Sequence, residues 1–358
     1  MHVYLDANAS EPLRPAARAA VLAAMEQPGN PSSIHASGRA VRRMLEDARE
    51  AVARRFGATP AQVVFTSGGT EADALAIHAL GQGRRLIIGA TEHDAISAAA
   101  PSAEILPVNA DGVADLAALA RLLDGPPALV CLMLANNETG TIQPIAEAAA
   151  LCHQAGALLH VDAAQAAGRM AIDLRTLGAD SLAISAHKLG GPQGVGALLV
   201  APSVSPNPLI RGGGQERGWR GGTPALPAIA GLGAAAAEAP ADLSALRDIL
   251  EQAAHGCGAE VIGRGAARIG NTACLALPGV SAQMQVMALD LANVAVSAGA
   301  ACSSGKIARS HVLEAMGLGP RAGEAIRVSL PWNATAADVE AFIAAYRAMA
   351  ARLSRSAA

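Results

Sequence analysis

Lysine is scarce in this chain, and its scarcity narrows where amine chemistry can occur. Among the 27 lysines and arginines, Lys188 and Lys306 are the two lysines. Lys188 follows the apolar run Leu182–Ser185 and precedes Gly190-Gly191, whereas Lys306 stands in a polar loop typical of a solvated surface. A lysine at the end of a buried strand is poorly hydrated, which favours its neutral, nucleophilic amine. Lys188 is therefore the candidate for a Schiff base with a carbonyl group.

A glycine-rich turn earlier in the chain could hold an anion. The run Ser67-Gly68-Gly69-Thr70-Glu71 lies between the apolar run Val63–Thr66 and a predicted helix. Small residues at a helix N-terminus leave backbone N–H groups directed at a ligand, and the helix dipole favours a phosphate there. The run matches neither the P-loop nor the dinucleotide-binding pattern. A plain strand-to-helix turn capped by Thr70 is the alternative interpretation.

A buried acid follows a third apolar run. Asp162 comes directly after Leu158–Val161, and Gln165 stands three residues later. A carboxylate at the end of a buried strand needs a partner, such as the protonated ring nitrogen of pyridoxal phosphate (PLP). Capping of a strand–helix junction is the alternative. Because ligands of open α/β sheets bind at the carboxyl ends of the strands, the anion cradle, the acid and Lys188 together predict a PLP site.

The elements that must position these residues form a repeating pattern. Short apolar runs alternate with Ala-rich helical stretches, which predicts an α/β fold whose mainly parallel sheet is covered by helices. From about Ser244 a helix, strands and a final helix predict a smaller α+β domain. We expect a large PLP-binding domain over residues 14–240 and a small domain formed by 1–13 and 241–358. The predicted strands cover residues 63–66, 86–89, 105–108, 128–135, 157–161, 181–185 and 196–200, and the predicted helices cover 36–56, 71–80, 94–100, 115–123, 144–154 and 336–353.

Composition excludes several other classes of protein. The 358 residues are 52% hydrophobic and 16% charged, which excludes a disordered chain. A net charge of −3 and 2% aromatic residues disfavour binding to nucleic acid. The N-terminus lacks a signal-peptide pattern, and the Ala-rich stretch 225–237 is too short for a membrane span, so we expect a cytoplasmic protein. Five cysteines without a C-x-x-C pair predict neither a metal site nor a disulfide scaffold.

The order of the motifs resembles that of the cysteine desulfurases, which are class V, fold-type I PLP enzymes. The resemblance is to the group typified by the nitrogen-fixation and housekeeping iron–sulfur enzymes, and it runs almost from end to end. It is carried by Tyr4-Leu5-Asp6-Ala7-Asn8-Ala9, Gly29-Asn30-Pro31-Ser32-Ser33-Ile34-His35, Phe65-Thr66-Ser67-Gly68-Gly69-Thr70-Glu71, Thr91-Glu92-His93, Asn136-Asn137-Glu138-Thr139-Gly140, His160-Val161-Asp162-Ala163-Ala164-Gln165, Ser185-Ala186-His187-Lys188, Gly212-Gly213-Gly214-Gln215-Glu216-Arg217, Arg220-Gly221-Gly222-Thr223 and Ala301-Cys302-Ser303-Ser304.

The resemblance implies a role for each motif residue around the cofactor. Lys188 would form the Schiff base with PLP and later abstract the Cα proton of the substrate. Asp162 would pair with the pyridinium nitrogen, and Gln165 would hydrogen-bond the phenolic oxygen. His93 would lie over the ring and assist proton transfer, although a polar residue at a helix start is the alternative. The residues implied near the ring or the phosphate are Asn137, Gly69, Thr70, Ser185 and His187.

The resemblance also implies a second subunit and a substrate-binding pair. Thr223 would reach the phosphate bound by the other subunit, so a homodimer with composite sites is expected. Asn30 and Arg327 would bind the carboxylate of the substrate, with Asn137 close by, since arginine suits a bidentate contact with a carboxylate. A surface salt bridge is the alternative role for Arg327.

Cys302 determines which reaction we expect. It opens a Ser- and Gly-rich segment near Lys306 and Arg309, a setting in which a thiolate becomes reactive. It would attack the sulfur of L-cysteine, alanine would leave, and the persulfide on Cys302 would pass to a sulfur acceptor or iron–sulfur scaffold protein. The other four cysteines lie in apolar or helical contexts that are typical of inert core residues: Cys131, Cys152, Cys257 and Cys274.

Three segments depart from the family pattern. Ser10-Glu11-Pro12 replaces Thr-Thr-Pro, Ala298–Cys302 replaces Ser-Gly-Ser-Ala-Cys, and Ser329–Asn333 replaces Ser-Leu-Gly-Arg-Phe. These changes concern substrate fit, loop motion and scaffold docking more than PLP binding. They keep two alternatives open. One is another class V PLP enzyme, an aminotransferase or selenocysteine lyase, in which Cys302 is dispensable. The other is a PLP-fold protein that binds a sulfur-carrier partner and has little activity of its own.

Overall fold

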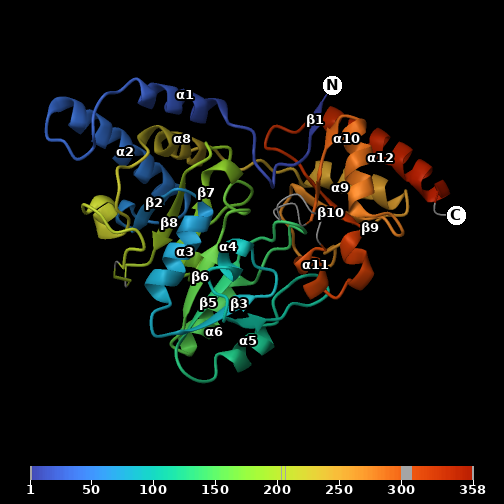
Figure 1. The fold of residues 1–358 in the computed structure, drawn as a ribbon, viewed down its shortest axis with the longest axis horizontal. Helices are drawn as coiled ribbons and strands as arrows, with labels where there is room; N and C mark the ends of the chain where they lie inside the picture. The colour runs from blue at the N-terminus through green and yellow to red at the C-terminus, as the bar shows by residue number, and fades with distance from the viewer. Residues whose placement is uncertain (1, 203, 206, 300–308, 357–358) are drawn as a thin grey trace.

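The computed structural model describes residues 2–202, 204–205, 207–299 and 309–356. Figure 1 shows two groups of elements. One group holds a seven-stranded sheet with its helices, and the other holds a four-stranded and a two-stranded sheet together with both ends of the chain. The α/β class predicted from the sequence is therefore confirmed. The boundaries predicted after residues 13 and 240 stay a prediction.

The seven-stranded sheet sets the direction in which the motif residues face. Its order is β2-β8-β7-β6-β5-β3-β4. The strands from β7 to β4 are parallel, and β8 runs antiparallel to both β2 and β7. The carboxyl ends of six strands therefore meet at one edge, where the predicted motifs follow all of them except β4. The strands are β2 (Val63–Thr66), β3 (Arg85–Gly89), β4 (Glu104–Leu106), β5 (Ala128–Met133), β6 (Leu158–Asp162), β7 (Ser181–Ser185) and β8 (Gly196–Val200).

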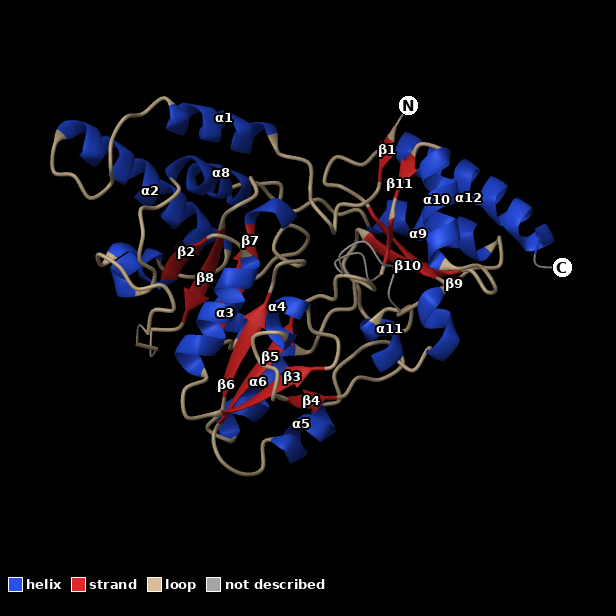
Figure 2. Cartoon of the chain, in the orientation of Figure 1, coloured by secondary structure: helices blue, strands red, loops and turns tan. Residues whose placement is uncertain are grey.

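Helices cover this sheet, as Figure 2 shows. Strands β2, β5, β7 and β8 are buried along their whole length, which explains why they are continuous apolar runs rather than alternating ones. Most predicted helices are present with ends that differ by a few residues. The helices of this group are α1 (Pro15–Met25), α2 (Ala36–Arg55), α3 (Gly69–Leu80), α4 (Asp94–Ser97), α5 (Leu116–Leu122), α6 (Ile145–Gln154), α7 (Leu174–Leu177) and α8 (Leu226–Ala236).

Three of these helices, α1, α7 and α8, were not expected from the sequence. Helix α8 packs against both α1 and α2, and its sequence is apolar on nearly every side, so it lacks the polar face that marks a surface helix. Its start at Leu226 also lies at the end of a Gly- and Pro-rich segment that resembles a long loop. Within the described ranges, no helix is both long and apolar enough to cross a membrane.

The second group of elements joins the two ends of the chain. Strand β1 (Val3–Tyr4) pairs in parallel with β11 (Val294–Ala295). The four-stranded antiparallel sheet has the order β12-β13-β10-β9. Its strands and the helices beside it are β9 (Glu260–Val261), β10 (Thr272–Ala276), β12 (Ser297–Ala298), β13 (Ala325–Ser329), α9 (Ser244–His255), α10 (Ala282–Leu291), α11 (His311–Ala315) and α12 (Ala336–Ser356).

A buried ion pair holds the glycine-rich segment after β8 against the large sheet. Arg49 of α2 donates to both carboxylate oxygens of Glu216 at 2.7 and 2.8 Å, and the two side chains are 3% and 4% exposed. Phe65 N of β2 donates to the same carboxylate at 2.8 Å. Glu216 has a positive φ of 48°, a conformation that non-glycine residues seldom adopt. The ion pair and the backbone contact together hold it there.

Removing the carboxylate of Glu216 should destabilise the fold strongly, because it leaves the buried Arg49 guanidinium with only the exposed carboxylate of Glu46, at 3.1 Å. We expect Glu216→Ala to lower the free energy of unfolding by about 3–5 kcal/mol, measured by urea denaturation. Arg175→Ala, which removes a well-exposed ion pair with Asp173, is the matched control and should change the midpoint little. Equal midpoints for the two variants would contradict this account.

Candidate active site

A cavity of about 490 Å³ opens at the edge of the large sheet where the motif residues meet. This volume is in the range of pockets that hold small molecules and cofactors. Residues from the N-terminal segment, from α3 and from the ends of β5, β6 and β7 line it. The sequence-predicted residues in its lining are Gly69, Thr70, His93, Asn137, Asp162, Gln165, Ser185, His187 and Lys188.

One end of the cavity has the features of an anion cradle. Helix α3 begins at Gly69 with Gly68 as its N-cap, so Thr70 lies in the first turn and does not cap the helix. The first backbone N–H groups of a helix have no partner within it, and Gly69 and Thr70, the first residues of α3, line the cavity. A Cβ atom on Gly69 would lie 3.3 Å from that of Ser185, which places the two predicted cradle residues side by side.

Close backbone packing fixes the position of this cradle. A Cβ atom on Gly196, the first residue of β8, would lie 2.6 Å from the carbonyl carbon of Gly68. Only glycine allows so close an approach.

Burial and the nearby Lys188 lower the pKa of His187 to about 4, so its imidazole is neutral at pH 7 and can donate one N–H.

Lys188 ends a short 3-10 turn, Ala186–Lys188, directly after β7. Its amine donates to the backbone carbonyl oxygens of Asn8 and Ala9, the latter at 3.0 Å. These carbonyls belong to the N-terminal segment, which the sequence analysis did not connect with the lysine. They hold the amine at the wall of the cavity that Ala9 also lines.

Two buried carboxyl groups lie deeper in the cavity. Burial and, to a smaller extent, the nearby Asp73 raise the pKa of Asp162 to about 7. Burial likewise raises the pKa of Asp73 to about 7. Asp162 also accepts from Ala164 N at 2.8 Å, but this bond closes a turn after β6 and caps no helix. A cationic heterocycle at Asp162 would restore the ionised carboxylate by Coulomb attraction.

Asp73 is a site residue that sequence reasoning missed. It stands on α3 three residues after Thr70, so helical spacing places both on one face, and that was the available signal. Its Oδ1 lies 3.1 Å from His160 Nε2, and His160 Nδ1 lies 2.8 Å from Ser181 Oγ. Burial lowers the pKa of His160 to about 4. This neutral imidazole joins α3, β6 and β7 beneath the cavity.

His93 satisfies both interpretations that its sequence allowed. Its Nδ1 accepts from Ala95 N at 3.1 Å and so caps α4. The same side chain lines the cavity. The neighbouring Glu92 is fully buried and accepts from Met133 N at 2.8 Å, which fixes this turn against β5.

Three other predicted residues lie outside the cavity lining. Thr223 is exposed and lines an adjacent cavity of about 180 Å³ that shares Ser67 and Gly194 with the first. Asn30 is exposed, and its Oδ1 accepts from Ser32 N at 2.9 Å. Their predicted contacts stay predictions.

Arg327, the third of these residues, is 3% exposed on β13. It donates to Asp6 Oδ1 at 2.8 Å and to the carbonyl of Asn137 at 3.2 Å. The ion pair that the sequence allowed is therefore present, but it is buried rather than on the surface. The contact with Asn137 places Arg327 directly behind the cavity wall.

Cys302 and Lys306 lie outside the described residues, but the flanks of their segment are described. Both flanks contact Glu138, a buried carboxyl group that follows β5. Its Oε2 accepts from Ser310 Oγ at 2.6 Å, and a Cβ atom on Gly299 would lie 2.1 Å from it. Residues 299 and 310 are therefore held at one point beside the cavity residue Asn137.

The remaining cysteines carry no sign of reactivity. Cys131, Cys152 and Cys274 are buried, and burial raises the thiol pKa of each, that of Cys152 to about 12. Cys257 is half-buried and lies in the second group of elements. Within the described ranges, no cluster of three or more histidine, cysteine or acidic residues could hold a metal ion.

Comparison with known proteins identifies the family. The family model for class V aminotransferases matches residues 3–342. The chain belongs to the class V aminotransferase family. This family consists of PLP-dependent enzymes, so the recognition made from the motifs is confirmed.

Similar members of the class V family share the whole fold. A protein of Cereibacter sphaeroides named cysteine desulfurase is 45% identical, over 94% of this chain and 93% of its own. The structure of a NifS-like protein from Rickettsia africae matches with a TM-score of 0.90 and 34% identity, over 98% of this chain and 99% of that one. A structure described as SspA in complex with cysteine matches with a TM-score of 0.83 and 28% identity, over 93% and 100%.

The raised pKa of Asp162 predicts how stability depends on pH in the cofactor-free protein. The folded state binds this proton more tightly than the unfolded chain, whose aspartate pKa is about 4. The resulting stabilisation is complete below about pH 4 and is lost as the pH rises through about 7. Raising the pH from 4 to 8 should therefore lower the melting temperature of the wild-type protein relative to that of Asp162→Asn. Parallel curves for the two proteins would contradict the raised pKa.

Proposed function

We propose that this protein is a PLP-dependent cysteine desulfurase that converts L-cysteine to L-alanine. The observation that carries the proposal is the convergence, in one cavity, of the Lys188 amine, the buried Asp162 carboxyl and the anion cradle of α3. The relatives that carry the name cysteine desulfurase support the choice of reaction within the family. The proposed role is to supply sulfur for iron–sulfur clusters or other sulfur-containing cofactors.

The residues of the cavity fit PLP at its phosphate, at its ring nitrogen and at its aldehyde group. The N-terminus of α3 and Ser185 would take the phosphate, with the neutral His187 donating beside them. Asp162 would hold the protonated ring nitrogen, which accounts for a carboxyl group that is otherwise buried at an unfavourable cost. When bound, PLP supplies an aldehyde that condenses with amines and a ring that delocalises the electron pair released at Cα.

The side chains of Lys188 and His93 have separate roles in the reaction. Lys188 carries the amine that binds the aldehyde carbon and then moves the proton at the substrate Cα. The carbonyls of Asn8 and Ala9 keep this amine at the cavity wall. His93 is held by its capping bond to Ala95 N, so its ring has a fixed orientation from which it assists proton transfer.

Cys302 provides the sulfur nucleophile. Its thiolate attacks the sulfur of the substrate, the new S–S bond forms, and the electron pair of the broken C–S bond stays with the carbon skeleton. Protonation of that skeleton gives alanine, and Cys302 holds the persulfide. Glu138 contacts both flanks of this segment through Gly299 and Ser310, which supports delivery of the thiol to this side of the cavity.

A second copy of the chain would complete the site. Thr223 is exposed beside the cavity instead of within it, which supports the proposed reach toward a phosphate bound in the partner subunit. The sulfur-acceptor or scaffold partner and the cytoplasmic location remain predictions from the sequence.

Desulfuration should require Cys302 and no other cysteine. We expect the wild-type protein with PLP and a thiol reductant to release alanine from L-cysteine, and Cys302→Ser to lower that rate by at least about a hundredfold. Cys257→Ser changes a half-buried cysteine in the second group of elements. It is the matched control and should keep the wild-type rate. Alanine release at an equal rate from Cys302→Ser would favour another class V reaction instead.

Arg327 should act on binding of the substrate carboxylate. Arg327→Lys keeps the charge beside Asp6 but loses the planar fork that binds a carboxylate through two N–H groups. We expect the KM for cysteine to rise about tenfold or more, with a smaller change in kcat. A lower melting temperature with an unchanged KM would show that Arg327 serves only the ion pair with Asp6.

A further inference from the structure

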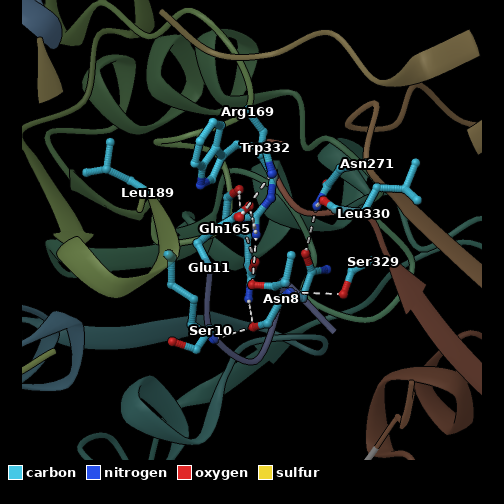
Figure 3. A network of polar contacts seen from close by, with 12 residues as sticks. Asn8, Ser10, Glu11, Gln165, Arg169, Leu189, Asn271, Ser329, Leu330 and Trp332 are labelled. Carbon is cyan, nitrogen blue, oxygen red and sulfur yellow. Dashed lines mark hydrogen bonds and ion pairs between the residues drawn. The ribbon is translucent and has the colours of Figure 1, made fainter. Parts of the chain in front are cut away.

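Two segments at which the sequence departs from the family pattern meet in the fold. Glu11 lies in the first of these segments and Trp332 in another, 321 residues later. Trp332 N donates to Glu11 Oε2 at 3.1 Å, and the Trp332 indole N–H donates to the Pro12 carbonyl at 2.8 Å. Figure 3 shows Glu11 between Trp332 and Arg169. The two departures therefore form one structural unit.

The other oxygen of Glu11 compensates a buried cation. Glu11 Oε1 lies 3.4 Å from an Nη atom of Arg169, and the side chains are 5% and 4% exposed. Burial lowers the pKa of Arg169 to about 10 and raises that of Glu11, so each charge is costly without the other. The other charged groups that act on this pair are Arg14, Lys188 and Arg327.

Arg169 in turn fixes the orientation of Gln165. It donates to Gln165 Oε1 at 2.9 Å and to the Gln165 backbone carbonyl at 2.7 Å. A guanidinium group can only donate, so the atom it contacts must be the amide oxygen. The amide NH₂ then lies on the other side, where it donates to Asn8 O at 3.1 Å. Gln165 lines the cavity and can present only a donor there.

We propose that Glu11 and Arg169 form a buried positioning pair that holds Gln165 as a hydrogen-bond donor toward an anionic oxygen in the cavity and sets the positive potential at that point. The inference rests on the proposed function, in which that oxygen is the phenolic oxygen of PLP. It goes further because it gives this chain's own Glu11 a role in tuning the protonation of the bound cofactor.

Removing one or the other charge of the pair should shift the pH midpoint of the bound cofactor in opposite directions. A purely structural role would not produce opposite shifts. Glu11→Gln keeps the contact with Trp332 but leaves the positive charge of Arg169 uncompensated. Arg169→Met removes that positive charge. We expect the midpoint of the pH-dependent change in visible absorbance of the PLP-loaded protein to fall by about one unit in Glu11→Gln and to rise by a similar amount in Arg169→Met.

Two conservative variants and one control make the titration decisive. Glu11→Asp and Arg169→Lys keep the charges and should titrate close to wild type. If Arg169→Met fails to fold, the contrast between the shifted Glu11→Gln and the unshifted Glu11→Asp carries the test. Glu104→Gln removes an exposed carboxylate that pairs with Arg85 at 2.7 Å, away from this pair, and it should leave the midpoint unchanged. Thermal melting of each cofactor-free protein reports stability separately.

The inference is overturned if Glu11→Gln and Arg169→Met titrate like wild type, or if they shift in the same direction. The measurement contains no cysteine, so its result does not depend on desulfuration. Loss of alanine release with opposite midpoint shifts would refute the proposed reaction alone. A wild-type protein without a visible band after loading with PLP would refute both.

Discussion

The extended segment between β1 and α1 links the two groups of elements, and the cavity depends on it. Ala7 N donates to Ser329 O on the four-stranded sheet at 3.1 Å, and Glu11 N donates to His187 O beside the seven-stranded sheet at 2.8 Å. Between these bonds, the carbonyl of Asn8 accepts from both Lys188 and Gln165. The first residues of the chain must therefore dock onto elements more than 150 residues away before the cavity wall is complete. Such distant contacts form slowly because the entropy of loop closure opposes them.

The charged side chains buried near this wall are paired with one another. A buried ion costs several kcal/mol unless it is paired and hydrogen-bonded, and the structure pairs Arg169 with Glu11 and Arg327 with Asp6. Asp162 differs from these paired acids. Its carboxyl group accepts from a backbone N–H and lies near the acidic Asp73, and its pKa is raised. A cationic ligand at this position would stabilise the ionised carboxylate, and Asp162 ends the strand next to that of Lys188.

The same reasoning explains two of the three departures from the family pattern, those at Glu11 and Trp332. Replacing a threonine by Glu11 puts a carboxylate into a buried position, which would be costly alone. Arg169 and the backbone N–H of Trp332 satisfy both of its oxygens, while Arg14 lies 4.9 Å from the Trp332 ring. Changes that are far apart in sequence thus compensate each other locally. No pattern of spacing could connect them, because the contact exists only after the two sheets are joined.

The sequence by itself determined the alternation of strands and helices, the cofactor class and the members of the cavity lining that follow β2, β6 and β7. It could do so because buried parallel strands are continuous apolar runs, and their carboxyl ends must share one edge. The tertiary structure decided the rest: the place of Asp73 in the cavity, the burial of Arg327 against Asp6, and the support of Lys188 by the N-terminal carbonyls. These depend on side-chain packing and burial between distant segments, which set pairing and pKa values but leave no periodic signal in the chain.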